Sequence, residues 1–305
     1  MTDSSLTFTP VGLEDYDRIY RYTSVYGEGS CQHSPVSMYS LSEKYGDSVC
    51  EQEGFLYTLR SGLCDETYRV YLAPFGSGDL KTAYQRILDD AAAHGKKAKF
   101  FTLTESAADF LSGAFPDRFD VEENRDLAEY FCRTQSTATF AGGQLQRRRR
   151  EVHTFWHLYG DRASIHPIVQ EDMDDILAFK ERWLSMSESD HDMSALGIES
   201  RMIDRQLAHF DELKLTGIVL RIDGWVEGIS YGTRLSDKYF DGLVEKGNRN
   251  IPHIAKVLRM ESAKQCAGDC EYFNMEEDVG VPGLRAVKMS YCPEYLLRKF
   301  IASER

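Results

Sequence analysis

Apolar residues recur along the chain with two different periods, and the two periods alternate. The segment LEDYDRIYRYT (13–23) places apolar side chains on one helical face after an acidic first turn, which predicts a helix. The segments GFLYTLR (54–60) and TYRVYLAPFG (67–76) have the alternation of strands, and a polar turn separates them. The other elements predicted for the first half are a helix over 78–96 and strands over 98–105 and 127–134.

The same order of elements is predicted again in the second half. SIHPIV (164–169) predicts a strand, and residues 170–186 have the three- and four-residue apolar spacings of a helix. Residues 216–235 predict a hairpin, because Asp223-Gly224 is a dipeptide that two-residue hairpin turns prefer. The remaining predicted elements are a strand over 238–247, a helix over 250–267 and a strand over 271–277.

Each half therefore reads as helix, hairpin, strand, helix and strand. This order predicts a mixed α/β fold of the α+β class, made of two copies of one unit, although no sequence identity between the halves is visible. The length of 305 residues also favours two domains. The predicted domains are 1–160 and 161–305, and the first is predicted to end in a long basic helix over 140–159.

Composition narrows the class of protein. The chain is 42% hydrophobic and 28% charged, as soluble globular proteins are. The net charge of -13 argues against a general surface for nucleic acid or anionic membranes, but it leaves room for a local basic groove. Seven cysteines without a CxxC pair, and an N-terminus without a signal-peptide pattern, predict a reduced cytoplasmic protein. No apolar run is long enough to predict a membrane-spanning helix.

The densest group of acids near cations lies in NMEEDVGVPGLRAVKMSY (274–291). Gly280, Pro282 and Gly283 predict a tight turn there, because glycine permits positive φ and proline fixes φ. A solvated turn between two strands would have the same composition, so the segment alone does not establish a site. Its charged residues are Glu276, Glu277, Asp278, Arg285 and Lys288.

The run Arg147–Arg150 is the densest positive charge in the chain. At 100° per residue the run surrounds most of a helix, so the four side chains cannot share one face. The apolar residues that follow, such as Val152 and Phe155, need a packed face, so some of the arginines should border a buried seam. Arginine at such a seam suits phosphate or carboxylate ligands, although a solvated helix end is the alternative.

Two other kinds of site receive little support. The turn after Lys246 leads into a predicted helix, whose N-terminus could bind an anion. However, only Gly247 stands there, so the glycine-rich phosphate loop of acetyl-CoA enzymes is weakly matched. The histidines show no metal-ligand spacing, and no nucleophile motif is present. We therefore expect no metal site and no tightly bound cofactor.

The segment NMEEDVGVPGLRAVKMSYCP (274–293) resembles the strongest motif of the bacterial DUF2156 family, which is homologous to the C-terminal domain of phosphatidylglycerol lysyltransferases. The family pattern runs Asn-x-Glu-x-Asp-x-Gly-x-x-Gly-Leu-Arg-x-x-Lys-x-Ser-Tyr-x-Pro. The basic helix is similar to a second family pattern, and the resemblance extends over nearly the whole chain. The matching residues of the motif are Asn274, Glu276, Asp278, Gly280, Gly283, Leu284, Arg285, Lys288, Ser290, Tyr291 and Pro293.

The resemblance implies two tandem GNAT-like (acyl-CoA N-acyltransferase-like) domains and an acyl-transfer site at splayed strands of the second domain. The implied reaction moves an aminoacyl group from an aminoacyl-tRNA-like donor to a soluble amine or hydroxyl acceptor. The catalytic candidates are Glu276, Glu277, Asp278 and Tyr291. The candidates for binding the donor and its phosphates are Arg147, Arg148, Arg149, Glu245, Lys246, Asn274, Arg285, Lys288 and Ser290.

Donor and partners follow from the same resemblance. The donor substrate is expected to be aminoacyl-tRNA or an acyl-CoA, with the tRNA acceptor end in a local basic groove. The acceptor is expected to be a small molecule or peptide, without membrane insertion. Two other functions fit the same fold: a non-catalytic module that binds an anionic ligand or a tRNA end, and an acetyl-CoA-dependent N-acetyltransferase.

Overall fold

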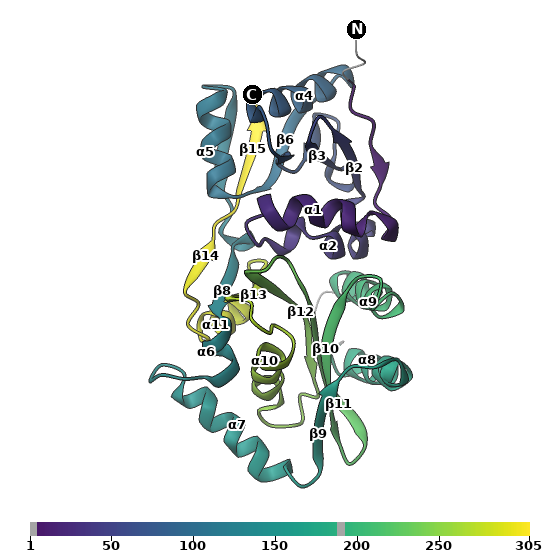
Figure 1. The fold of residues 1–305 in the computed structure, drawn as a ribbon, viewed down its shortest axis with the longest axis vertical. Helices are drawn as coiled ribbons and strands as arrows, with labels where there is room; N and C mark the ends of the chain where they lie inside the picture. The colour runs from purple at the N-terminus through teal and green to yellow at the C-terminus, as the bar shows by residue number, and fades with distance from the viewer. Residues whose placement is uncertain (1–4, 188–192) are drawn as a thin grey trace. The chain divides into compact units, whose positions relative to one another are not determined.

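The computed structural model describes residues 5–187 and 193–305. The chain divides into two compact units and passes between them more than once (Figure 1). Unit 1 is formed by the chain up to Glu129, by Glu277–Pro282 and by Leu296–Arg305. Unit 2 is formed by Tyr130–Glu276 and Gly283–Tyr295.

Unit 1 is built on a sheet with the strand order β1-β2-β3-β4-β6-β15-β7, and β5 pairs with β3. β4 and β6 are parallel, and helices α4 and α5 pack against this part of the sheet (Figure 1). The strands are β1 (Thr9–Pro10), β2 (Asp47–Gln52), β3 (Phe55–Arg60), β4 (Tyr68–Tyr71), β5 (Phe75–Gly76), β6 (Lys97–Leu103), β7 (Phe119–Glu123) and β15 (Phe300–Glu304). The helices are α1 (Tyr16–Tyr26), α2 (Pro35–Ser40), α3 (Ser42–Tyr45), α4 (Leu80–Ala93) and α5 (Glu105–Ala114).

Unit 2 is built on a second sheet, with the order β14-β8-β13-β12-β11-β10-β9. Helix α10 packs on one face of β10–β12 and helix α8 on the other (Figure 1). The strands are β8 (Glu129–Arg133), β9 (Ala163–Pro167), β10 (Leu215–Ile222), β11 (Trp225–Arg234), β12 (Tyr239–Gly247), β13 (Tyr272–Glu277) and β14 (Tyr295–Leu297). The helices are α6 (Thr134–Thr139), α7 (Gln146–Tyr159), α8 (Met173–Ser187), α9 (Met193–Ala208), α10 (Ile254–Gln265) and α11 (Pro282–Met289).

The two sheets repeat one run of elements. In unit 1 the hairpin β2–β3 is followed by β4, helix α4 and the parallel strand β6. In unit 2 the hairpin β10–β11 is followed by β12, helix α10 and the parallel strand β13. The turn of the second hairpin is the predicted one, because Asp223 and Gly224 both have positive φ, at 52° and 83°. This repetition agrees with the predicted duplication.

The units do not divide at the predicted residue 160. Residues 130–160 lie with unit 2, because β8 joins the second sheet and α7 packs against α10. The end of the chain returns to unit 1, because β15 pairs with β6 and β7. Compact unit 2 is therefore not the same set of residues as the predicted domain 161–305.

The basic helix is shorter than predicted over 140–159. Helix α6 ends at Thr139, the next residue Phe140 has a φ of 46°, and α7 begins only at Gln146. Gly142, with a φ of 89°, and Gly143 lie between the two helices, since glycine adopts non-helical conformations at little steric cost. The arginine run therefore occupies the first turns of α7.

No helix within residues 5–187 and 193–305 has the length and apolar character needed to cross a membrane.

Unit 1 contains a buried ion pair that ties its last strand to its core. The Lys299 Nζ lies 2.7 Å from the Glu129 carboxylate, and both side chains are fully buried. The Ser30 hydroxyl and the Cys31 N–H donate to the same carboxylate, at 2.6 and 2.9 Å. Burial raises the pKa of Glu129, but Lys299 and these hydrogen bonds lower that pKa below its usual value.

We predict that K299M destabilises the protein by about 3–5 kcal/mol, because it leaves the Glu129 carboxylate buried without its cation. Urea denaturation at neutral pH measures the free energy of unfolding. Since the folded pKa of Glu129 is depressed, the contribution of the pair is present at neutral pH and is lost as the pH falls through that pKa. The double variant E129L/K299M should lose much less; an equal loss in both variants would contradict the ion-pair explanation.

Candidate active site

The parallel strands β12 and β13 separate near their middle and form a fork. They pair at only three successive positions, the last of which is Asp241 with Asn274. A register shift opposite Tyr231 and Thr233 of β11 gives β12 one extra residue directly after Asp241. Such a bulge bends the strand that carries it, so β12 turns away from β13 beyond this point. In unit 1, by contrast, β4 pairs with β6 along its whole length.

Two glycines permit the close packing at the fork. A Cβ atom on Gly232 would lie 1.9 Å from the Asp241 carbonyl oxygen. A Cβ atom on Gly242 would lie 2.4 Å from the ring of Phe273. A side chain at Gly232 would displace the backbone of β12, and one at Gly242 would displace the Phe273 ring, so both glycines favour this packing.

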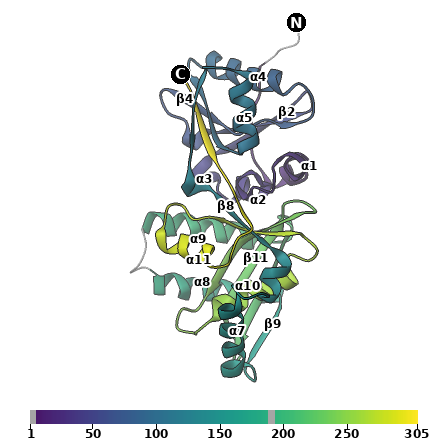
Figure 2. The same ribbon diagram turned by 90° about the vertical axis from the view of Figure 1, so that its left-hand side faces the viewer.

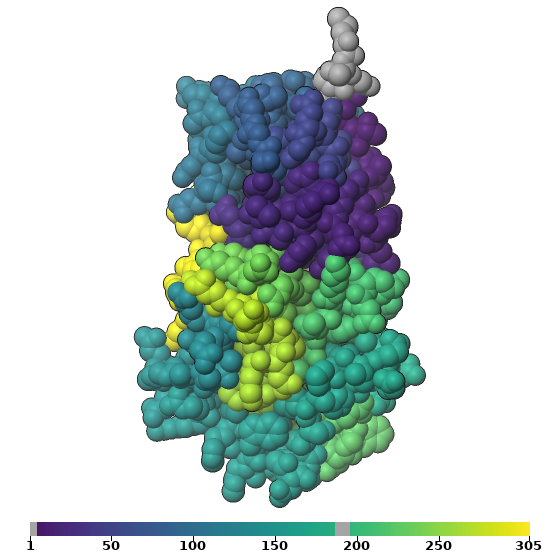
Figure 3. Space-filling model, viewed as in Figure 1, coloured from purple at the N-terminus to yellow at the C-terminus, as the bar shows by residue number. Residues whose placement is uncertain are grey.

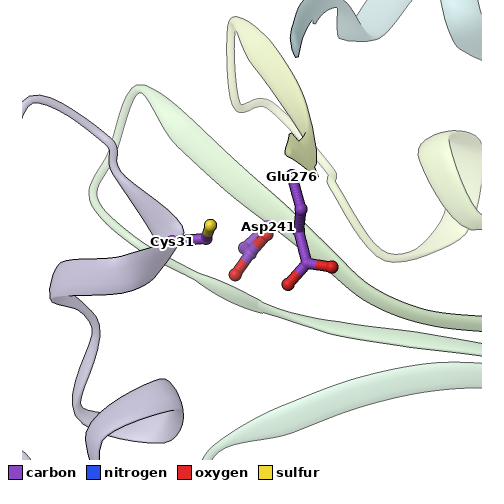
Figure 4. A group of neighbouring side chains, drawn as sticks. All are labelled: Cys31, Asp241 and Glu276. Carbon is purple, nitrogen blue, oxygen red and sulfur yellow. The ribbon is translucent and has the colours of Figure 1, made fainter. Parts of the chain in front are cut away.

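Two carboxylates converge where the strands separate. Oxygen atoms of Asp241 and Glu276 lie within 4.8 Å of each other, and Figure 4 shows the two side chains next to one another. Asp241 is fully buried, and Glu276 is half-buried. The φ of Glu276 is 58°, and its N–H donates to the buried Asn274 side chain at 2.8 Å. Two carboxylates this close favour a shared proton or a bound cation.

Tyr231 of β11 also has acidic residues around it. Its buried hydroxyl donates to the Gln206 side chain at 2.9 Å. Burial raises the pKa of Tyr231 far above its ordinary value, and the charges of Glu199, Asp204 and Glu276 raise it further. Glu199 and Asp204 are paired with Lys246 and Lys180, so Glu276 is the acid near Tyr231 that belongs to the fork.

A second cluster surrounds Tyr291, which follows α11 in the chain. Two arginines lie near its ring, with guanidinium carbons 5.5 Å (Arg148) and 5.6 Å (Arg259) from the ring centroid. Arg259 forms an ion pair with Glu245 at 2.8 Å. Arg148 donates to the Ser290 hydroxyl at 2.6 Å. The structure thus gathers predicted site residues from α7, β12 and the motif segment.

Burial controls the ionisation of this cluster. It raises the pKa of Glu245, and the charge of Arg259 only partly opposes the rise. It also raises the pKa of Tyr291, and the Glu245 carboxylate adds to that rise. Burial would lower the pKa of Arg259, but Glu245 and its neighbours raise it overall, so the guanidinium stays charged. At neutral pH the Tyr291 hydroxyl is protonated and able to donate a hydrogen bond.

Two other predicted cations of unit 2, Lys246 and Lys288, lie near aromatic rings. The Lys246 Nζ forms an ion pair with Glu199 at 2.8 Å and lies 4.0 Å from the centroid of a Trp183 ring. Lys288 is buried on α11, and its Nζ lies 5.9 Å from the Tyr130 ring centroid. Arg285 is half-buried on the same helix.

Two of the predicted catalytic acids belong to unit 1. The Gln32 side chain donates to Glu277 at 2.7 Å. Arg125 forms an ion pair with the fully buried Asp278 at 3.2 Å. Of the three neighbouring acids predicted from the sequence, only Glu276 lies in unit 2. Unit 2 also contains the fork and Tyr291.

The turn of the motif is formed by Asp278–Val281, two residues before the predicted Gly280–Gly283. The Val281 N–H donates to the Asp278 carbonyl at 2.9 Å, and Gly280 has a φ of 75°. Pro282 then opens helix α11, a position that suits a residue without an N–H group. Gly283 consequently lies inside the helix and not in the turn.

The remaining arginines of the run lie on different sides of α7. Arg147 is exposed and pairs with Glu151 at 3.1 Å. Arg149 donates to the Phe140 carbonyl at the end of α6. Arg149 also lines a groove of about 820 Å³ between α6, α7 and α10, whose surfaces adjoin in Figure 3. The charged or titratable residues of this α6–α7–α10 groove are Arg133, Arg149, His153, Lys264, Asp269 and Glu271.

A model of the family described as "Phosphatidylglycerol lysyltransferase, C-terminal" matches residues 24–303. The chain belongs to this family. The match includes both units, and the resemblance seen in the motif at 274–293 is confirmed. Membership of the phosphatidylglycerol lysyltransferase C-terminal family supports an acyltransferase-type function.

Solved structures of the same fold are similar over almost the whole chain. A conserved protein of unknown function from Bacteroides thetaiotaomicron VPI-5482 is 26% identical, with a TM-score of 0.93, covering 98% of this chain and 100% of that one. The C-terminal domain (DUF2156) of a putative lysylphosphatidylglycerol synthetase from Agrobacterium fabrum is 15% identical, with a TM-score of 0.66, covering 96% and 92%. L-PGS from Bacillus licheniformis is 14% identical, with a TM-score of 0.66, covering 97% and 92%.

No curated protein matches. The expected tandem GNAT-like fold is confirmed.

Sequence reasoning missed Asp241 and Arg259. An Asp-Gly pair inside a predicted strand is a signal for a bulge or a close backbone approach, and Asp241-Gly242 is such a pair. Arg259 directly follows the buried residues Val257 and Leu258 on α10, which indicates that its stem reaches into the packed side of the helix. The sequence contains both signals, but neither shows which residue Asp241 or Arg259 contacts.

We predict that R259M destabilises the protein by about 3 kcal/mol at pH 8, the low end for a largely buried pair. The loss should shrink at pH 5, because the Glu245 pKa is already raised and rises further without Arg259. A raised carboxyl pKa gives stability at low pH that is lost as the pH rises through the folded pKa. Urea denaturation at both pH values measures the effect. The control R259M/E245Q should lack this pH dependence, and its persistence there would assign it to another group.

Proposed function

We propose that the chain transfers an aminoacyl group from an aminoacyl-tRNA-like ester to an amine or hydroxyl acceptor, at the β12–β13 fork. The observation that carries this proposal is the convergence of Asp241 and Glu276 at the fork. An acetyl group has no charge for such a pair to recognise. An aminoacyl ester carries an ammonium group, which a pair of carboxylates binds favourably.

The reaction needs a proton acceptor as well as a binding group. The acceptor's nitrogen or oxygen attacks the ester carbonyl carbon, and the new amide or ester bond forms as the ester C–O bond to the donor breaks. In our proposal Glu276 takes the proton from the attacking atom and returns it to the leaving oxygen, while Asp241 keeps the ammonium group in place. The negative charge that develops on the carbonyl oxygen needs a hydrogen-bond donor.

Tyr291 fits the role of that donor. Its raised pKa keeps the hydroxyl protonated at neutral pH, and the adjacent guanidinium groups of Arg148 and Arg259 favour negative charge nearby. The donor's phosphates need further cations. Arg149 and Lys264 at the rim of the α6–α7–α10 groove are suited to this role, because phosphate contacts depend mainly on positive charge.

We predict that the protein accelerates loss of the aminoacyl ester from aminoacyl-tRNA when a small amine is supplied as acceptor. E276Q should reduce the rate by about 100-fold or more, as expected for the loss of a general base. Y291F should reduce it by about 100-fold, as expected for the loss of an oxyanion donor. Release of a radiolabelled amino acid, followed by acid precipitation of the remaining aminoacyl-tRNA, measures the rate.

The matched control is E171Q, which removes an exposed carboxylate elsewhere in unit 2 and should leave the rate unchanged. N-acetylated aminoacyl-tRNA should be a poor substrate, because it lacks the ammonium group. Stabilisation of the protein by acetyl-CoA in a thermal-shift assay, without any effect on aminoacyl-tRNA, would reject the proposal in favour of an N-acetyltransferase.

A further inference from the structure

Two free cysteines of unit 2 meet at one peptide group. Cys132 of β8 is buried, and its Sγ donates to the Tyr291 carbonyl oxygen at 3.7 Å. That carbonyl belongs to the peptide bond that leads into Cys292, so the Cys292 Cα lies about 3 Å from the same oxygen. Cys292 itself is exposed. A buried thiol is therefore directed at the backbone next to an exposed thiol.

Backbone hydrogen bonds hold the two segments together. Next to Cys132, the Phe131 carbonyl accepts a hydrogen bond from the Glu294 N–H at 2.8 Å. Before this contact the chain forms a turn, in which the Cys292 N–H donates to the Met289 carbonyl at 3.0 Å. Strand β8 and helix α11, which ends at Met289, can be followed in Figure 2. The contacts on both sides of Cys292 keep that residue beside β8.

The two thiols differ in how readily they react. Cys292 is open to solvent, and its φ of 55° lies in the left-handed region that is uncommon for residues other than glycine. Burial raises the pKa of Cys132 to about 12, with Arg259 opposing the rise and Cys292 adding to it. At neutral pH the Cys132 thiol is therefore protonated, and an oxidant meets Cys292 first.

We propose that Cys132 and Cys292 form a reversible disulfide when a peroxide oxidises the exposed thiol. The Cys292 sulfur attacks one oxygen of the peroxide, the O–O bond breaks, and the residue becomes a sulfenic acid while the other oxygen leaves as water. The Cys132 sulfur then attacks the sulfenic sulfur, the S–S bond forms, and hydroxide leaves with the Cys132 proton as a second water. The two thiols lose two electrons in all, and the peroxide takes them up.

This disulfide would change the turn that follows Tyr291. Cys132 would exchange its contact with the Tyr291 carbonyl for a covalent bond to the next residue, and β8 would be joined to the chain after α11. An exposed cysteine beside a second cysteine that can resolve its sulfenic acid is the usual arrangement of a redox-sensing site. The disulfide is independent of the proposed transfer reaction, because its formation is measured without any substrate.

Peptide mapping of the full chain tests this pair. Each cysteine is the only one in its tryptic peptide, which spans 126–133 for Cys132 and 289–298 for Cys292. After hydrogen peroxide treatment of the native chain and capping of the remaining thiols, mass spectrometry should find these two peptides joined, in an amount that accounts for most of the oxidised Cys292. Dithiothreitol added before capping should release both peptides. In C132A, Cys292 should remain a sulfenic acid that dimedone captures. In C292A, the buried Cys132 should stay reduced.

The matched control is C64S, which replaces a half-buried cysteine of unit 1 and should form the joined peptides as the wild type does. Circular dichroism establishes that each variant is folded. The proposal is overturned if peroxide leaves Cys292 of the native chain reduced, or if Cys292 is oxidised without joining Cys132. It is also overturned if Cys292 joins another cysteine or a second copy of the chain, or if the joined peptides form only in urea.

Discussion

The candidate site depends on one extra residue in β12, directly after Asp241. The bulge ends the pairing with β13, so Asp241 and Glu276 meet where the two strands separate and not along a continuous ladder. The equivalent strands of unit 1 are paired along all of β4, so the duplicated fold carries an open pair in one copy and a closed pair in the other. Gly232 and Gly242 make the bulge sterically possible, which links a local backbone irregularity to the chemistry of the unit.

The opened strand presents two environments of opposite character. Asp241 begins the divergent part of β12 beside Glu276, and two neighbouring carboxylates favour a cation. Glu245, four residues later, holds Arg259 against Tyr291, and this cluster favours developing negative charge. The two ends of this segment of β12 therefore differ in electrostatic character.

Periodicity in the sequence predicted the repeated elements well, since helices and strands with one buried face leave a clear pattern. It did not predict that β15 would join the first sheet, because KFIASER is short and its position depends on the buried pair Lys299–Glu129. The site was predicted in part. Arg148, Glu245, Ser290 and Tyr291 were named from a motif and do gather. Asp241 and Arg259 were not named, because a bulge and a buried cation become visible only when the neighbouring strand or ring is known.

The motif segment is locally unfavourable in two independent ways. Glu276 and Val279 have positive φ, at 58° and 44°, which is rare for non-glycine residues and rarest for β-branched ones. A few residues later, α11 exposes apolar side chains and buries Lys288. Neither feature improves the stability of an isolated chain, and each costs free energy that the rest of the fold must offset. Unfavourable backbone conformations and reversed side-chain exposure are concentrated at functional sites of proteins. Their occurrence together within 276–289, between the fork and Tyr291, therefore favours a segment shaped for ligands and surfaces outside the protein.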